Sequence, residues 1–139
     1  MPPPVFNLLA SLPSARDAEV SQVLLAGKGV RFERIVSLGQ ASPEGFWYDQ
    51  EEAELVIVLS GRARLTIAGE PEDRVLGPGD AVLLPIRCRH RVAWTDPDHP
   101  TVWLALFIDP KLKPSASAPW RTTEESRCIL RNMGTSLFA

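Results

Sequence analysis

Between residues 30 and 108 the chain alternates short β-prone runs with turns rich in glycine and proline, and this pattern constrains the fold most strongly. Apolar and polar side chains alternate along residues 30–38 and again along 62–68, as in strands with one buried face. The more apolar runs at 54–60 and 101–108 fit strands that are buried more deeply. Many short strands at regular spacing are typical of a β-sandwich or β-barrel.

Shorter runs predict further strands at residues 46–50, 74–76, 81–84 and 89–95. The Gly77-Pro78-Gly79-Asp80 sequence is a strong turn signal between two of them. A length of 139 residues fits one domain. We therefore expect an all-β domain, a small antiparallel barrel over residues 30–109.

The segments that flank the strands predict short helices. Residues 1–29 would form a proline-rich arm and then a short helix, capped by Ser14 and ended by Gly27 and Gly29. Residues 110–139 would form a linker and a short C-terminal helix. These flanks carry more apolar side chains than one small barrel needs for cover, so we expect a homodimer.

Composition excludes several classes of partner. The net charge of −2 gives no basic footprint for nucleic acid, and no apolar run approaches the 18 residues of a membrane span. The two cysteines, Cys88 and Cys128, do not form a disulfide framework. We expect a cytoplasmic protein whose partner is a small molecule.

Two segments together resemble the cupin family. The second motif of that family places a glycine, a proline and a histidine at fixed offsets, and Gly79, Pro85 and His90 match them. Arg87 stands where the family usually has another glycine. The resemblance implies a small antiparallel β-barrel of jelly-roll type, to which the flanking segments of this chain would add their short helices.

The first cupin motif is only partly present. It has two histidines one residue apart, then a glutamate three or four residues later and a glycine after six more. Glu54 and Gly61 have the glutamate–glycine spacing, but neither histidine is present. The histidine positions fall on Trp47 and Asp49, or on Tyr48 and Gln50, depending on the register of the turn before Glu54. The sequence leaves both registers open.

The resemblance also implies a divalent metal, and zinc, iron, manganese and nickel all suit imidazole and carboxylate ligands. His90 and Glu54 are the retained candidate ligands, and Asp49 is the best third ligand because it is anionic. Gln50 offers a carbonyl oxygen, and Tyr48 offers a phenolate only after losing its proton. The alternative is that His90 is a buried histidine hydrogen-bonded to Glu54 or Tyr48.

Aromatic residues are candidates for the wall of the pocket. Trp47 and Tyr48 precede the strand that carries Glu54, and Trp94 lies four residues after His90. Regular alternation would place Trp94 on the same face as His90.

Three functions stay open on the sequence alone. The first is a cupin barrel that binds a divalent metal and a small polar or anionic molecule, with enzymatic activity undecided. The second is a metal-free module for small-molecule binding or sensing, which the missing histidine pair favours. The third is a structural module whose interior is filled by Trp47 and Trp94.

Overall fold

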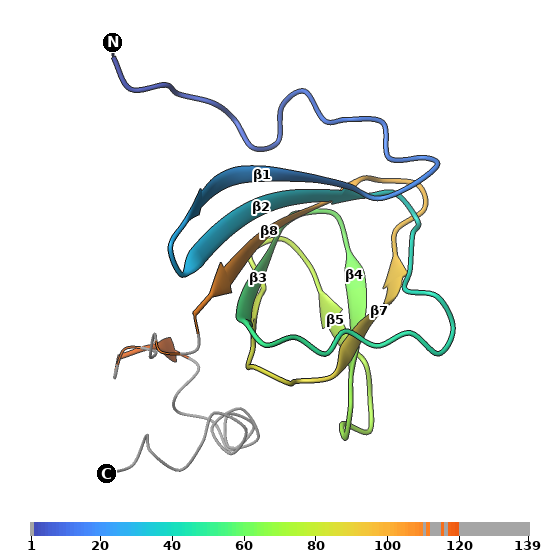
Figure 1. Ribbon diagram of the computed structural model, residues 1–139. Coiled ribbons are helices and arrows are strands. Elements are labelled where there is room, and N and C mark those ends of the chain that lie inside the picture. The colour runs from blue at the N-terminus through green and yellow to red at the C-terminus, as the bar shows by residue number, and fades with distance from the viewer. Residues whose placement is uncertain (1, 110, 112–114, 116, 120–139) are drawn as a thin grey trace.

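The computed structural model describes residues 2–109, 111, 115 and 117–119. Eight antiparallel strands within them form two sheets, with orders β1-β2-β8-β3-β6 and β5-β4-β7 (Figure 1). The bounds are β1 Val20–Gly27, β2 Val30–Ser37, β3 Ala53–Ser60, β4 Ala63–Ile67, β5 Arg74–Leu76, β6 Ala81–Leu84, β7 His90–Thr95 and β8 Thr101–Ile108. This all-β arrangement agrees with a jelly-roll barrel.

The core forms where the inward faces of the two sheets meet. Strand β8 lies in the larger sheet between β2 and β3, and alternate residues Trp103, Ala105 and Phe107 are buried. The main buried cluster contains residues from both sheets: Val56, Val58, Ala63, Leu65, Leu76, Val82, Leu84 and Trp103. The period-2 pattern of the sequence therefore corresponds to one buried face on the strands that form the core.

Most of the predicted strands are present within two residues of their expected ends. The predicted strand at 46–50 is an exception, because only Tyr48 forms an isolated bridge, with His90. The remainder of that segment runs as a loop beside the start of β7.

The predicted N-terminal helix is wrong, because its residues form β1. This strand pairs with β2 from Val20 opposite Val36 to Gly27 opposite Val30. A register shift between Val23 and Leu25 interrupts the alternation of side chains, so the strand pattern is hidden in the sequence. The two glycines that were expected to end a helix instead belong to a tight hairpin connection.

The N-terminal arm crosses the outer side of β1 and β2 (Figure 1). The buried guanidinium of Arg34 donates hydrogen bonds to the carbonyl oxygens of Leu8 and Ala10, both at 3.2 Å, and to the side chain of Gln22. The predicted C-terminal helix lies outside the described residues. The described part of the chain contains no helix that is long and apolar enough to cross a membrane.

Large apolar side chains are exposed on the arm and on β1. Val5 and Phe6 of the arm, and Val23 and Leu25 of the strand, are each more than half exposed. Such surface suits contact with another chain. The homodimer stays a prediction.

Candidate functional site

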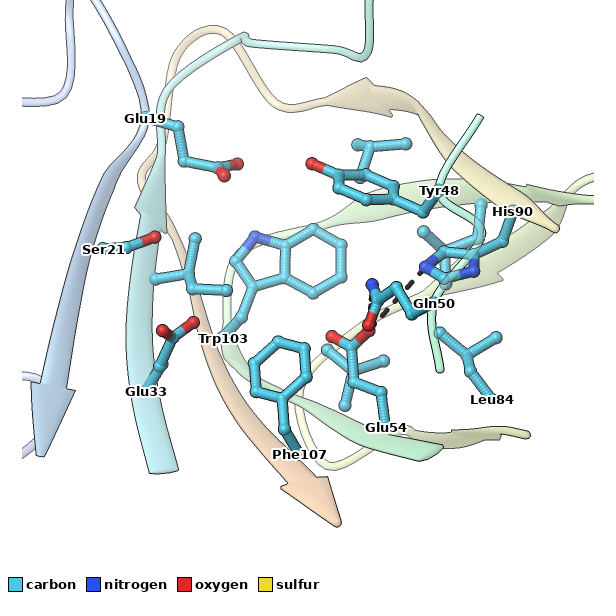
Figure 2. A pocket seen from close by; sticks show the side chains of 14 residues that line it. Glu19, Ser21, Glu33, Tyr48, Gln50, Glu54, Leu84, His90, Trp103 and Phe107 are labelled. Carbon is cyan, nitrogen blue, oxygen red and sulfur yellow. Dashed lines mark hydrogen bonds and ion pairs between the residues drawn. The ribbon is translucent and has the colours of Figure 1, made fainter. Parts of the chain in front are cut away.

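A cavity of about 240 Å³ lies between the two sheets (Figure 2). It is lined by side chains from seven strands, by Glu19 just before β1, and by the loop that precedes β3. The apolar part of the lining also belongs to the buried core or packs beside it. The lining residues are Glu19, Ser21, Glu33, Ile35, Tyr48, Gln50, Glu54, Val56, Leu65, Leu84, His90, Val92, Trp103 and Phe107.

His90, the first residue of β7, is held by both its backbone and its ring. Its backbone N–H and C=O pair with those of Tyr48, and the two rings stack with centroids 5.2 Å apart. The Nδ1 atom lies 2.8 Å from the carbonyl oxygen of Cys88, so Nδ1 carries the proton and donates it to that acceptor. In the neutral ring, the lone pair of Nε2 then faces the cavity.

Glu54 approaches His90 from the opposite sheet. Its Oε2 lies 3.7 Å from Nε2 of His90 and accepts a hydrogen bond of 3.4 Å from the amide of Gln50 (Figure 2). The pKa of Glu54 is raised from 4.5 to about 7, chiefly by burial and then by the charge of Glu33, while Arg31 opposes this shift. The carboxyl group can therefore hold a proton close to neutral pH.

Burial lowers the pKa of His90 below its ordinary value of 6.5, and the hydrogen bond to the Cys88 carbonyl opposes this effect. We therefore expect the His90 ring to stay neutral at pH 7. The chain has two histidines, so one-dimensional proton NMR over a pH series resolves both ring signals. The signal that is lost in His90→Gln should titrate with a midpoint below 6.5. A midpoint above 7 for that signal would contradict the neutral ring.

The structure selects one of the two registers that the sequence left open. Tyr48 and Gln50 line the cavity, together with Glu54 and His90. Asp49 points outward and pairs with Arg87 at 3.3 Å, so it is not available as a ligand beside Glu54. Trp47, which was expected to shape the pocket, lies outside the cavity lining, and the Arg89 guanidinium lies over its ring.

Trp94 also lies outside the cavity lining, contrary to the expectation from alternation. In the pairing of β4 with β7, Leu65 is opposite Val92 while its neighbour Arg64 is opposite Trp94. The extra residue, Ala93, is a β-bulge that moves Trp94 to the opposite face from Val92. The Trp94 ring there lies 5.5 Å from the Arg64 guanidinium.

Comparison with known families agrees with this architecture. The family model described as "Cupin domain" matches residues 35–107, which is more than half of the chain. The chain belongs to the cupin family. None of the curated proteins compared with this cupin matches it.

Among the solved structures with the same fold is a protein whose sequence is similar to that of this chain. A protein from Ralstonia eutropha JMP134, named as a putative mannose-6-phosphate isomerase, is 50% identical, with 77% of this chain and 99% of that chain covered and a TM-score of 0.74. An RmlC-like cupin from Desulfovibrio desulfuricans is 17% identical, with coverage of 76% and 96% and a TM-score of 0.63. KdgF from Halomonas sp. is 20% identical, with coverage of 66% and 80% and a TM-score of 0.55. At these lower identities the likeness concerns the fold alone.

Arg87 shows why the family usually has a glycine at this motif position. Its φ angle is +59°, in the left-handed region that costs a residue with a side chain about 1 kcal/mol or more. The Arg87 side chain lies outside the cavity and pairs with Asp49 and Glu51, while its backbone N–H donates to the Gln50 carbonyl oxygen at 2.7 Å. These contacts hold the loop that carries Gln50 against the start of β7.

Sequence reasoning missed the side of the cavity formed by β1, β2 and β8. Ser37 donates a hydrogen bond of 2.8 Å to Glu19 and accepts one of 3.1 Å from Nε1 of Trp103, which fixes that carboxylate at the cavity. Ser21 and Glu33 complete this side. The available signal was Glu33, a charged residue on the same strand face as the apolar Ile35.

The donor set does not fit the metal that the cupin family implies. Beside His90 lie the carboxyl group of Glu54, which can hold a proton near pH 7, the amide of Gln50 and the phenol of Tyr48, whose pKa burial raises above 10.0. The carboxyl groups of Glu19 and Glu33 line the opposite side of the cavity. Across the described residues, no group of three His, Cys, Asp or Glu side chains is arranged to hold a metal ion. Metal sites normally need three or four such ligands.

Proposed function

We propose that this cupin binds a small organic molecule inside the barrel without a resident metal. The proposal rests mainly on the position of Glu54, whose Oε2 lies 3.7 Å from Nε2 of His90 inside the cavity. The hydrogen bond to the Cys88 carbonyl fixes the tautomer of the His90 ring. A carboxyl group of raised pKa beside a neutral imidazole gives a polar centre that can form hydrogen bonds with a ligand without a metal charge.

The size and lining of the cavity support a ligand with a substantial apolar part. An apolar cavity of about 150 Å³ already holds one benzene molecule, and the cavity here has about 240 Å³. The rings of Trp103 and Phe107 and aliphatic side chains such as Val56 and Leu84 supply apolar contact. A few polar groups in a mostly apolar cavity are typical of small-molecule sites.

A second candidate function comes from the 50% identical protein that is named as a putative mannose-6-phosphate isomerase. A phosphorylated sugar would bring a doubly charged anion. The cavity lining contains the carboxyl groups of Glu19, Glu33 and Glu54, and none of the described residues that line it is a lysine or arginine. Phosphate recognition usually relies on such cations or on exposed backbone N–H groups, so the lining argues against this substrate.

Titration calorimetry with zinc, manganese and mannose 6-phosphate distinguishes the two candidate functions. We expect neither stoichiometric metal binding nor binding of mannose 6-phosphate in the presence of either metal. The matched variants His90→Gln and His99→Gln should behave alike, because His99 lies exposed in a loop and His90 would be the sole imidazole at a barrel site. Stoichiometric metal binding that disappears in His90→Gln but persists in His99→Gln would overturn the metal-free function.

A further inference from the structure

The polar atoms that face the cavity differ in whether they already have a partner. Most donors are engaged within the protein: Nδ1–H of His90 with the Cys88 carbonyl, Nε1–H of Trp103 with Ser37, and the Gln50 amide with Glu54. The hydroxyl groups of Tyr48 and Ser21, which can donate or accept, also line the cavity.

The acceptors, by contrast, are only partly used. His90 is 5% exposed, and its Nε2 has Glu54 as its polar neighbour at 3.7 Å, which is longer than a hydrogen bond. Nε2 faces the cavity, so its lone pair can accept a hydrogen bond from a ligand that carries an N–H or O–H group. The carboxyl group of Glu54 offers a second acceptor beside it.

The side of the cavity opposite Glu54 is also negatively charged. In Figure 2 the carboxylates of Glu19 and Glu33 face the cavity from the side opposite Glu54 and His90, with the rings of Trp103 and Phe107 between them. Glu19 is exposed, so it lies where a ligand would enter. Glu33 pairs with Arg31 at 3.2 Å, and that guanidinium lies 4.2 Å from the centre of the Phe107 ring rather than in the cavity lining.

We propose that the ligand of this cavity is a small organic ammonium ion, with its N–H groups directed at Glu54 and at Nε2 of His90. This inference rests on the proposed function and names its ligand class. The carboxylates of Glu19 and Glu33 favour the entry of a cation, and the faces of Tyr48 and Trp103 add cation–π attraction. The carbon body of the amine then lies against the apolar lining.

Three probes of similar shape and different charge test the ligand class: benzylamine, benzyl alcohol and benzoate. Binding to the full chain is measured at pH 8, where benzylamine is a cation and Glu54 is mostly ionised. We expect benzylamine to bind about tenfold more tightly than benzyl alcohol, as a charge-assisted hydrogen bond gives, and benzoate to bind most weakly.

Variants that each remove one negative charge test which carboxyl groups cause the preference for benzylamine. Glu19→Gln keeps an acceptor for Ser37 and should weaken benzylamine severalfold while leaving benzyl alcohol unchanged. Glu72→Gln removes the same charge from an exposed turn outside the cavity and should change neither affinity. Glu54→Gln should remove most of the preference for the cation.

The outcomes distinguish the ammonium assignment from the broader proposal of a metal-free binding site. Equal affinity for benzylamine and benzyl alcohol, or tighter binding of benzoate, would overturn the ammonium assignment while the metal-free binding site stands. An absence of binding by all three probes at millimolar concentration, with no change in the ring signal of His90, would overturn both.

Discussion

Gly61→Ala should destabilise the protein by about 4 kcal/mol, which lowers Tm by roughly 10–20 °C for a chain of this size. A Cβ atom at this position would lie 2.5 Å from Cα of Thr101 and 2.6 Å from the carbonyl oxygen of Pro100, and φ is +86°. Backbone atoms cannot yield as a flexible side chain can. Displacing Thr101 would also break its hydrogen bonds with the backbone of Arg62. Thermal and urea unfolding of the variant measure the loss.

Gly69→Ala is the matched control for this clash. Gly69 has a similar φ of +90°, but a Cβ atom there would meet nothing within 4 Å. The control should be destabilised only by the left-handed backbone conformation, which costs an alanine about 1 to 2 kcal/mol. Equal losses in the two variants would show that backbone conformation, rather than the close approach of Thr101, determines the role of Gly61.

Glu54→Gln should make the protein more stable above pH 7 and change little at pH 4.5. The folded protein holds the proton of Glu54 with a pKa of about 7 instead of 4.5, so its stabilising effect is complete below pH 4.5 and is lost as pH rises through 7. At about 1.4 kcal/mol per pKa unit, this loss is about 3 kcal/mol. Urea unfolding at intervals from pH 4.5 to 8 measures the difference between the two proteins.

The opposite pH effect of His90 is present in both proteins and cancels in that difference. Glu51→Gln is a suitable control, because the Glu51 side chain is 84% exposed. The difference in free energy of unfolding between Glu51→Gln and the unaltered chain should stay constant over the same pH range. A flat difference for Glu54→Gln as well would mean that Glu54 titrates in the folded protein much as it does in the unfolded chain.

The sequence predicted the barrel strands well because each has one face in the core. Burial on one face imposes a period of two on the side chains, and glycine or proline marks where a strand ends. Strand β1 was not predicted, because it lies at the edge of its sheet, nearly all of its residues are exposed, and its register shifts after Val23. Both conditions weaken the alternation that sequence analysis depends on.

The candidate site was predicted only in part. Glu54 and His90 were found because the spacing of their motifs is local, and both line the cavity. Asp49 belonged to one of two registers that the sequence left open, and Trp94 was placed by assuming an unshifted strand. A one-residue change reverses the face of every side chain that follows, and the bulge at Ala93 makes such a change before Trp94.

By itself, the sequence determined the all-β class and the two residues at the polar centre, because strand periodicity and motif spacing are properties of neighbouring residues. Only the tertiary structure decided that Tyr48 and Gln50 join this centre and that Glu19 and Glu33 face it from the other sheet edge. The physical reason is that the charge and register of a cavity depend on which strands pair and where they bulge, and these contacts join residues far apart in the chain.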